Sequence, residues 1–155
     1  MRSHEQKRLP NTGGPPTPGK PAQTPWDQVA SWYDSFVGGE GSEYHQRVVI
    51  PGTLRLLEMQ PGERVLDLAC GQGVLCRALQ GLGVQVTGVD LSGELIQRAR
   101  QRSPKGIRYL VADARGLASM LPGESFHAVA CVLSVQNMDP VEPVFAQCAR
   151  LLEPG

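Results

Sequence analysis

The stretch from Val65 to Gly73 constrains this chain most, because an apolar run ends in an acid and then in a two-glycine turn. Val65 to Leu68 is typical of a short buried strand that carries Asp67, and an amphipathic segment follows Gly73. Glycines let a backbone approach a ligand where a Cβ would collide, and the first turn of a helix offers free N–H groups and a positive dipole end. The stretch therefore predicts a strand, a turn and a helix arranged around a nucleotide-type ligand.

Two more acids follow the next two apolar runs. Asp90 lies in Gly88-Val89-Asp90-Leu91-Ser92, and Asp113 lies in Ala112-Asp113-Ala114. An open sheet of parallel strands binds its ligands outside the carboxyl ends of the strands, where the strand order reverses. Three acids at successive strand ends therefore indicate one ligand site rather than three unrelated turns.

Short apolar runs alternate with amphipathic helices from Arg64 onward, which predicts a parallel sheet with right-handed crossovers. We expect strands near 64–68, 84–89, 107–111 and 126–133. The fold class is therefore α/β, with helices on both faces of the sheet.

At these motifs the chain resembles the class I S-adenosylmethionine-dependent methyltransferases, in particular the small-molecule branch that includes the ubiquinone and menaquinone biosynthesis enzymes. The resemblance covers about residues 26 to 155 and implies a Rossmann-like three-layer αβα domain over 63–155 with strand order 3-2-1-4. It also implies that the chain stops before the family's fifth strand. We therefore expect an uncovered apolar edge at 129–133, through which the isolated chain would self-associate with negligible turnover.

The resemblance implies a role for each residue of the cofactor site. Asp67 would face the ammonium of the methionine moiety, and Asp90, 19 positions after Gly71, would accept hydrogen bonds from the ribose hydroxyls. Asp113 would accept from the adenine amino group, and the Ala114 N–H would donate to the ring. The other expected contacts are Tyr33, Ala69, Gly71, Gly73, Leu91 and Leu133.

The acceptor would lie beside the segment after the fourth strand, where Gln136 or Asn137 could orient it or could only bond within the loop. This segment lacks the Asp/Asn-Pro-Pro-aromatic signature of enzymes that methylate nucleic-acid amines, so a small-molecule acceptor is favoured. None of the histidines is a convincing general base, and the catalytic residues stay unassigned. A non-catalytic cofactor-binding module is one alternative. An NAD-dependent oxidoreductase is another, although Asp113 and the missing third glycine of G-x-G-x-x-G argue against it.

The N-terminal part divides into two segments. Residues 1–25 are rich in proline and glycine and predict a disordered tail. Residues 26–62 predict a helical flap over the ligand end of the sheet, with helices at 26–36 and 42–59, the second kinked or divided at Pro51.

Composition limits the partners. Fifteen basic and fifteen acidic residues give no net charge, so neither nucleic acid nor a membrane is expected as a partner. The basic run from Arg98 to Arg108 is expected to be a solvated helix end. The four cysteines are too widely spaced for a metal or disulfide motif and predict buried thiols; no run is long enough to span a membrane. A cytoplasmic protein with no metal is the resulting expectation.

Overall fold

The computed structural model describes residues 24–154, so residues 1–23 of the tail predicted at 1–25 lie outside the described residues. Thr24 caps the first helix through a capping box with Asp27. The prediction of a disordered tail is therefore wrong for Thr24 and Pro25, which belong to this cap and helix. The elements, in chain order, are α1 (Pro25–Val37), the π-helix η1 (His45–Val49), α2 (Ile50–Leu57), β1 (Arg64–Leu68), α3 (Val74–Gln80), β2 (Gln85–Asp90), α4 (Gly93–Arg102), β3 (Arg108–Val111), the 3₁₀ segment η2 (Ala114–Met120), β4 (Ala128–Cys131), the 3₁₀ turn η3 (Val135–Asn137) and α5 (Glu142–Leu151).

The four strands form one parallel sheet in the order β3-β2-β1-β4, which confirms the predicted fold class and strand order. In this register Asp67 of β1 lies opposite Gly88 of β2 and Ala130 of β4. The strand order reverses between β1 and β4, so the carboxyl end of β1 lies at the crevice where such sheets bind ligands. β4 is shorter than the predicted 126–133, because its last residues turn into the loop that leads to η3.

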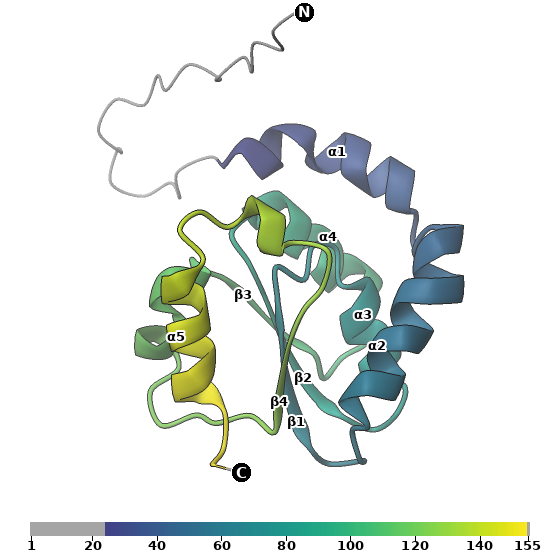
Figure 1. The fold of residues 1–155 in the computed structure, drawn as a ribbon. Helices are drawn as coiled ribbons and strands as arrows, with labels where there is room; N and C mark the ends of the chain where they lie inside the picture. The colour runs from purple at the N-terminus through teal and green to yellow at the C-terminus, as the bar shows by residue number, and fades with distance from the viewer. Residues whose placement is uncertain (1–23, 155) are drawn as a thin grey trace, which may run out of the picture.

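Two apolar cores cover the two faces of the sheet, because alternate strand residues point to opposite faces. On one face Val65 and Val86 pack with Leu79 of α3 and Ile96 of α4. On the other face the core contains Leu66, Leu68, Val89, Leu117, Leu121, Phe126, Val144 and Leu151, which connect the sheet to η2 and α5. Figure 1 shows α3 and α4 on one side of the strands and α5 on the other.

Of the two α-helices before the sheet, only α1 lies over the carboxyl ends of the strands. In Figure 1, α1 crosses above the ends of the strands, and α2 descends beside α3. Pro51 lies in the first turn of α2, directly after the π-helical turn His45–Val49. A proline has no N–H to continue the helical ladder, which accounts for the change of helix type at Pro51, inside the helix that the sequence predicted to be kinked or divided there.

The outer edge of β4 is partly lined by the chain that follows α5. Leu152 forms a parallel bridge with Phe126, and the Glu153 N–H donates to the Phe126 carbonyl at 2.9 Å. This contact lies before β4 begins, so the apolar run itself has β1 as its only neighbour in the described sheet. Self-association through this edge stays a prediction. None of the helices within residues 24–154 is long and apolar enough to cross a membrane.

Candidate cofactor site

A cavity of about 360 Å³ opens at the carboxyl ends of the strands, beneath α1. Nine of the ten residues predicted to bind the cofactor line it: Tyr33, Asp67, Ala69, Gly71, Asp90, Leu91, Asp113, Ala114 and Leu133. The volume is within the range of about 300–1,000 Å³ that small-molecule sites occupy. The structure therefore brings the strand-end motifs together in one place.

Asp67 is the most buried acid of the cavity, with 2% of its surface exposed. Its carboxylate accepts a hydrogen bond from the Cys76 thiol, with Sγ 3.1 Å from Oδ2. Burial and, to a smaller extent, the negative charge of Asp90 raise the pKa of Asp67 to about 7, although the bond from Cys76 acts in the opposite direction. No cation within residues 24–154 forms an ion pair with Asp67, so this acid is suited to receive a positive group from a ligand.

Asp90 shapes the turn after β1 as well as the cavity wall. Its Oδ2 accepts from the Gly71 N–H at 2.8 Å, and its Oδ1 accepts from the Ser92 N–H at 2.9 Å. Burial nevertheless raises the pKa of Asp90 above its ordinary value, against these two bonds. Each carboxylate oxygen has a second lone pair, so Asp90 can also accept from ligand hydroxyls.

The residues that follow β3 form a polar end of the cavity. Asp113 caps η2 and forms an ion pair with Arg115, whose hydrogen bonds hold the pKa of Asp113 below its ordinary value. Ala114 begins η2, where backbone N–H groups have no partner within the helix. Leu91 exposes 44% of its surface at the cavity, an apolar side chain that a flat ring could cover.

Two of the non-glycine residues at the cavity have left-handed backbone angles. Ala69 has φ of 53° and Leu133 has φ of 55°. This conformation costs a residue with a Cβ about 1–2 kcal/mol. Among the described non-glycine residues only Glu58, outside the cavity, shares it, so backbone strain is concentrated where β1 and β4 end, as expected of a binding site.

The two glycines of the first motif have different roles. Gly71 lines the cavity at φ of 55°, and a Cβ built on it would lie 3.5 Å from the ring of Tyr33. Gly73 does not line the cavity. It precedes α3 at φ of 83°, and a Cβ there would meet the Tyr109 hydroxyl at 2.3 Å. Gly73 therefore has a packing role, because the missing side chain lets α3 begin against β3. Its contact with the cofactor stays a prediction.

The flap supplies the upper wall. Tyr33 and Trp26 of α1 line the cavity and pack edge to face, with their ring centroids 6.0 Å apart. Burial, followed by the charges of Asp90 and Asp67, raises the pKa of Tyr33, so its hydroxyl stays protonated and can donate. This arrangement is consistent with Tyr33 as one of the expected cofactor contacts.

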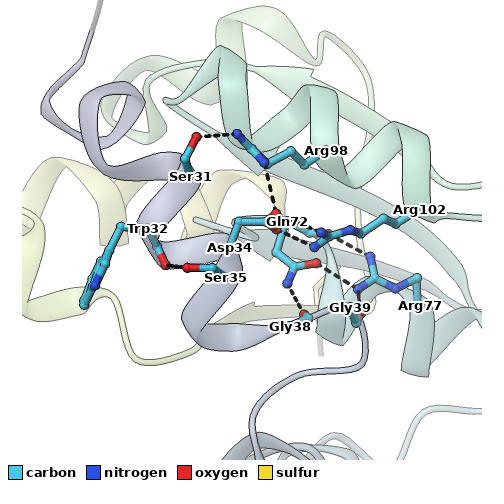
Figure 2. Close-up of polar contacts among 10 residues, drawn as sticks. All are labelled: Ser31, Trp32, Asp34, Ser35, Gly38, Gly39, Gln72, Arg77, Arg98 and Arg102. Atoms are coloured by element: carbon cyan, nitrogen blue, oxygen red, sulfur yellow. Dashed lines mark hydrogen bonds and ion pairs between the residues drawn. The ribbon is translucent and has the colours of Figure 1, made fainter.

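Ionic contacts hold α1 against α4. Asp34, 6% exposed, forms ion pairs with Arg98 and Arg102, and Arg98 also donates to Ser31 at 2.8 Å (Figure 2). At the start of α1, Asp27 accepts a hydrogen bond from the Ser92 hydroxyl. The expectation of a solvated basic face is therefore wrong for Arg98 and Arg102, whose side chains are 27% and 33% exposed.

A second set of contacts joins the chain after α1 to the cofactor turn. Gln72, between the two motif glycines, donates to the Gly38 carbonyl, and Arg77 of α3 donates to the Gly39 carbonyl (Figure 2). Arg77 also donates to the Gln72 carbonyl at 2.7 Å. We call these contacts, together with the Asp34 ion pairs, the flap latch.

The loop after β4 resolves an alternative that the sequence left open. Ser134, Asn137 and Met138 line the cavity, whereas Gln136 does not and donates to the Leu133 carbonyl at 2.8 Å. Gln136 therefore bonds within the loop, and Asn137 is the amide that faces the cavity. Ser92 lies outside the cavity lining and caps α4.

The sequence missed several lining residues of the flap, among them His45, Val49 and Ile50. Their helical spacing marks one face of a helix, but the π-helical turn before Pro51 decides which face turns toward the cavity. Of the cysteines, Cys76 is buried and the other three are half-buried, and all four are free. Within residues 24–154 no cluster of three or more His, Cys, Asp or Glu side chains is placed to hold a metal ion.

The parallel 3-2-1-4 sheet, its two helical layers and a cavity lined by three strand-end acids define a Rossmann-like nucleotide-cofactor domain. A family model described as "Methyltransferase domain" matches residues 65–155, more than half of the chain. The chain therefore belongs to this methyltransferase-domain family.

Relatives agree with this assignment. The chain is 34% identical over 139 residues to a ubiquinone biosynthesis O-methyltransferase of Xanthomonas campestris, an alignment that covers 86% of this chain and 58% of the relative. It thus spans less than two thirds of that relative's length. A similar protein of the same description from Thiobacillus denitrificans is 38% identical over 97 residues, covering 61% of this chain and 41% of the relative.

Solved structures show the same fold. An S-adenosylmethionine-dependent methyltransferase of Mesorhizobium loti superposes with a TM-score of 0.62 at 33% identity, covering 71% of this chain and 51% of the other. A methyltransferase of Thiobacillus denitrificans, in complex with S-adenosylhomocysteine, gives 0.64 at 24% identity and covers 86% and 54%. At the latter identity the likeness concerns the fold.

Proposed function

We propose that this chain carries the S-adenosylmethionine site of a methyltransferase that acts on a hydroxyl group of a small molecule. The observation that carries the proposal is the presence of two buried, cation-free carboxylates, Asp67 and Asp90, at adjacent strand ends in one cavity. The O-methyltransferase relatives support the reaction class.

The residues present fit the cofactor from end to end. In this proposal Asp67 binds the ammonium of the methionine moiety, and the Tyr33 hydroxyl donates to its carboxylate. Asp90 accepts from the ribose hydroxyls. Leu91 is suited to pack against the adenine ring. Asp113 and the Ala114 N–H are suited to form hydrogen bonds with its edge.

The bound cofactor supplies an activated methyl group on a sulfonium centre. The chain's own contribution is to align the acceptor with that group and to exclude water, which raises the effective concentration of the reacting atoms. Leu133, Asn137 and Met138 form the wall on the acceptor side, and α1 closes the cavity above. We assign Asn137 to orient the acceptor.

Calorimetric titration of the chain with S-adenosylhomocysteine and with NAD tests the proposal. We expect saturable binding of S-adenosylhomocysteine and none of NAD. Asp90→Ala removes a charged acceptor of hydrogen bonds worth about 1.5–3 kcal/mol each, so the affinity should fall at least about tenfold. Glu124→Gln, which breaks an ion pair with Arg108 outside the cavity, is the matched control.

Equal affinity of the folded Asp90→Ala variant would contradict the ribose assignment, and tight NAD binding would favour the oxidoreductase alternative. A release of S-adenosylhomocysteine from S-adenosylmethionine that depends on added catechol, a simple aromatic diol, would distinguish methyl transfer from binding alone.

A further inference from the structure

Among the histidines of residues 24–154, only His45 lines the cavity. It belongs to the π-helical turn η1, half-buried, and a Cβ built on Gly41 would touch both the His45 Cβ at 2.9 Å and Val74 at 3.0 Å. Val74 begins α3, directly after the glycine turn that follows Asp67. His45 therefore lies at the Asp67 end of the cavity and away from Asp113, where adenine is assigned.

The ring of His45 is oriented by one protein contact. Its Nδ1 lies 2.8 Å from the Ser42 hydroxyl, which also accepts from the His45 backbone N–H at 3.4 Å. When Nδ1–H donates to Ser42, the other nitrogen, Nε2, carries a free lone pair. Nε2 forms no hydrogen bond to any residue within 24–154.

The surroundings keep this imidazole neutral. Burial lowers the pKa of His45 below its ordinary value, and no nearby charge contributes to the shift. The charged and titratable groups that share the cavity are Tyr33, Asp67, Cys70, Asp90, Asp113, Arg115 and Asp139. On its own helix, Glu43 and Arg47 pair with each other in solvent, with side chains 75% and 77% exposed.

We propose that His45 is the general base that takes the proton of the acceptor hydroxyl, an inference that rests on the proposed function. The acceptor oxygen forms its bond to the methyl carbon, the electron pair of the broken carbon–sulfur bond goes to sulfur, and the hydroxyl proton goes to Nε2. The resulting imidazolium then releases the proton to solvent. Ser42 is a positioning residue that fixes the ring and its tautomer.

This role suits the two walls of the cavity. Asn137 and Met138 belong to the loop after β4, and His45 belongs to the flap. In this proposal an acceptor held by the loop lies between that loop and His45. Without a base, a phenolic hydroxyl stays largely protonated at neutral pH and is a poor nucleophile. A neutral imidazole in a closed cavity supplies the missing proton acceptor.

The first test follows the three histidines by NMR in the complex with S-adenosylhomocysteine, with catechol as the probe. The His45→Gln variant assigns the His45 signals, and His127, which lies outside the cavity and accepts from the Arg64 N–H, is the internal control. We expect nitrogen shifts that show an unprotonated Nε2 at neutral pH. Catechol should shift the His45 signals and leave those of His127 unchanged.

The second test compares catechol methylation by His45→Gln and by the matched variant His127→Gln. General-base catalysis contributes about 10²–10⁴-fold, so His45→Gln should lose at least about a hundredfold in kcat. Its affinity for S-adenosylhomocysteine should stay within about twofold. With 4-nitrocatechol, which ionises more readily, the defect of His45→Gln should shrink, which a merely structural role would not produce.

Several results would overturn the inference. One is a protonated Nε2 at neutral pH, and another is His45 signals that do not shift when catechol is added to the complex. A third is a loss of kcat in His45→Gln that is equal for both catechols. A tenfold loss of S-adenosylhomocysteine affinity in His45→Gln would instead assign His45 to the methionine carboxylate. Failure of the unaltered chain to bind S-adenosylhomocysteine is a separate result, which rejects the proposed function itself.

Discussion

The Cys76 thiol donates a hydrogen bond to the carboxylate of Asp67 across 3.1 Å inside the protein. The contact joins the first turn of α3 to the end of β1. Asp67 forms no ion pair within residues 24–154. A carboxyl with a pKa of about 7 is half protonated at neutral pH. A positive ligand group beside it would favour the ionised form, so ligand binding and proton release at Asp67 should be coupled.

The affinity for S-adenosylhomocysteine should therefore rise with pH up to about 7 and level off above it. The free protein binds a proton at Asp67 below this pH and the complex does not, so affinity should change by up to about tenfold per pH unit there. Calorimetry in buffers of different ionisation enthalpy measures the released proton directly. Asp67→Asn should bind weakly and without this dependence; an Asp67→Asn variant with the unaltered pH profile would reject the coupling.

Substitutions of Cys76 should move the midpoint of that profile. The thiol bond stabilises the ionised form of Asp67, so Cys76→Ala should raise the pKa of Asp67 and shift the midpoint upward. Cys76→Ser keeps a donor at the same position and is the matched control, with a midpoint at or below that of the unaltered chain. Equal midpoints for alanine and serine would mean that the thiol bond does not affect Asp67.

Gly73→Ala should destabilise the fold strongly. A left-handed residue with a Cβ costs about 1–2 kcal/mol, and forcing a methyl group against the Tyr109 hydroxyl costs about 1–3 kcal/mol more. The contact that must give way is 2.3 Å. Gly93→Ala is the matched control, since a Cβ there meets nothing within 4 Å at the start of α4. Thermal unfolding measures the stability of both variants. Similar unfolding midpoints for Gly73→Ala and Gly93→Ala would contradict the packing role of Gly73.

The sheet could be predicted from the sequence because its signals are local. An apolar run, an acid and a glycine lie next to one another around Asp67, and the same pattern of run and acid recurs at Asp90 and Asp113. Parallel strands bring these ends together whatever the details of the helices. The family resemblance, rather than this pattern alone, led to the expectation that Ala69 and Leu133 belong to the site.

The flap could not be predicted to the same depth, because its contacts join residues far apart in the chain. Arg98 and Arg102 follow Asp34 by 64 and 68 positions, and a basic run at a helix end is by itself typical of solvent exposure. The orientation of His45 depends on the π-helical turn, which shifts the helix face relative to an ordinary α-helix. The packing role of Gly73 was missed for the same reason, since its partner Tyr109 lies two strands away.

The flap latch should decide whether α1 stays docked over the cavity. Asp34→Asn keeps the size of the side chain but removes the charge that pairs with Arg98 and Arg102. Loss of one partner of a buried pair costs about 3–5 kcal/mol, and because both arginines reach solvent we expect a smaller cost of about 1–3 kcal/mol. Hydrogen exchange of α1 amides should accelerate while that of β1 amides stays slow, because the sheet does not depend on the flap.

Cofactor affinity provides the functional measure of the same change. Tyr33 precedes Asp34 in α1 and lines the cavity, so a helix that undocks also withdraws the tyrosine from the site. We expect S-adenosylhomocysteine to bind Asp34→Asn at least about fivefold more weakly, a free-energy change of about 1 kcal/mol. Glu43→Gln, which breaks an ion pair of side chains about three-quarters exposed, should change neither exchange nor affinity. Fast exchange in β1 as well as α1 would mean that Asp34 stabilises the whole domain, and unchanged exchange in α1 would mean that the latch does not hold the flap.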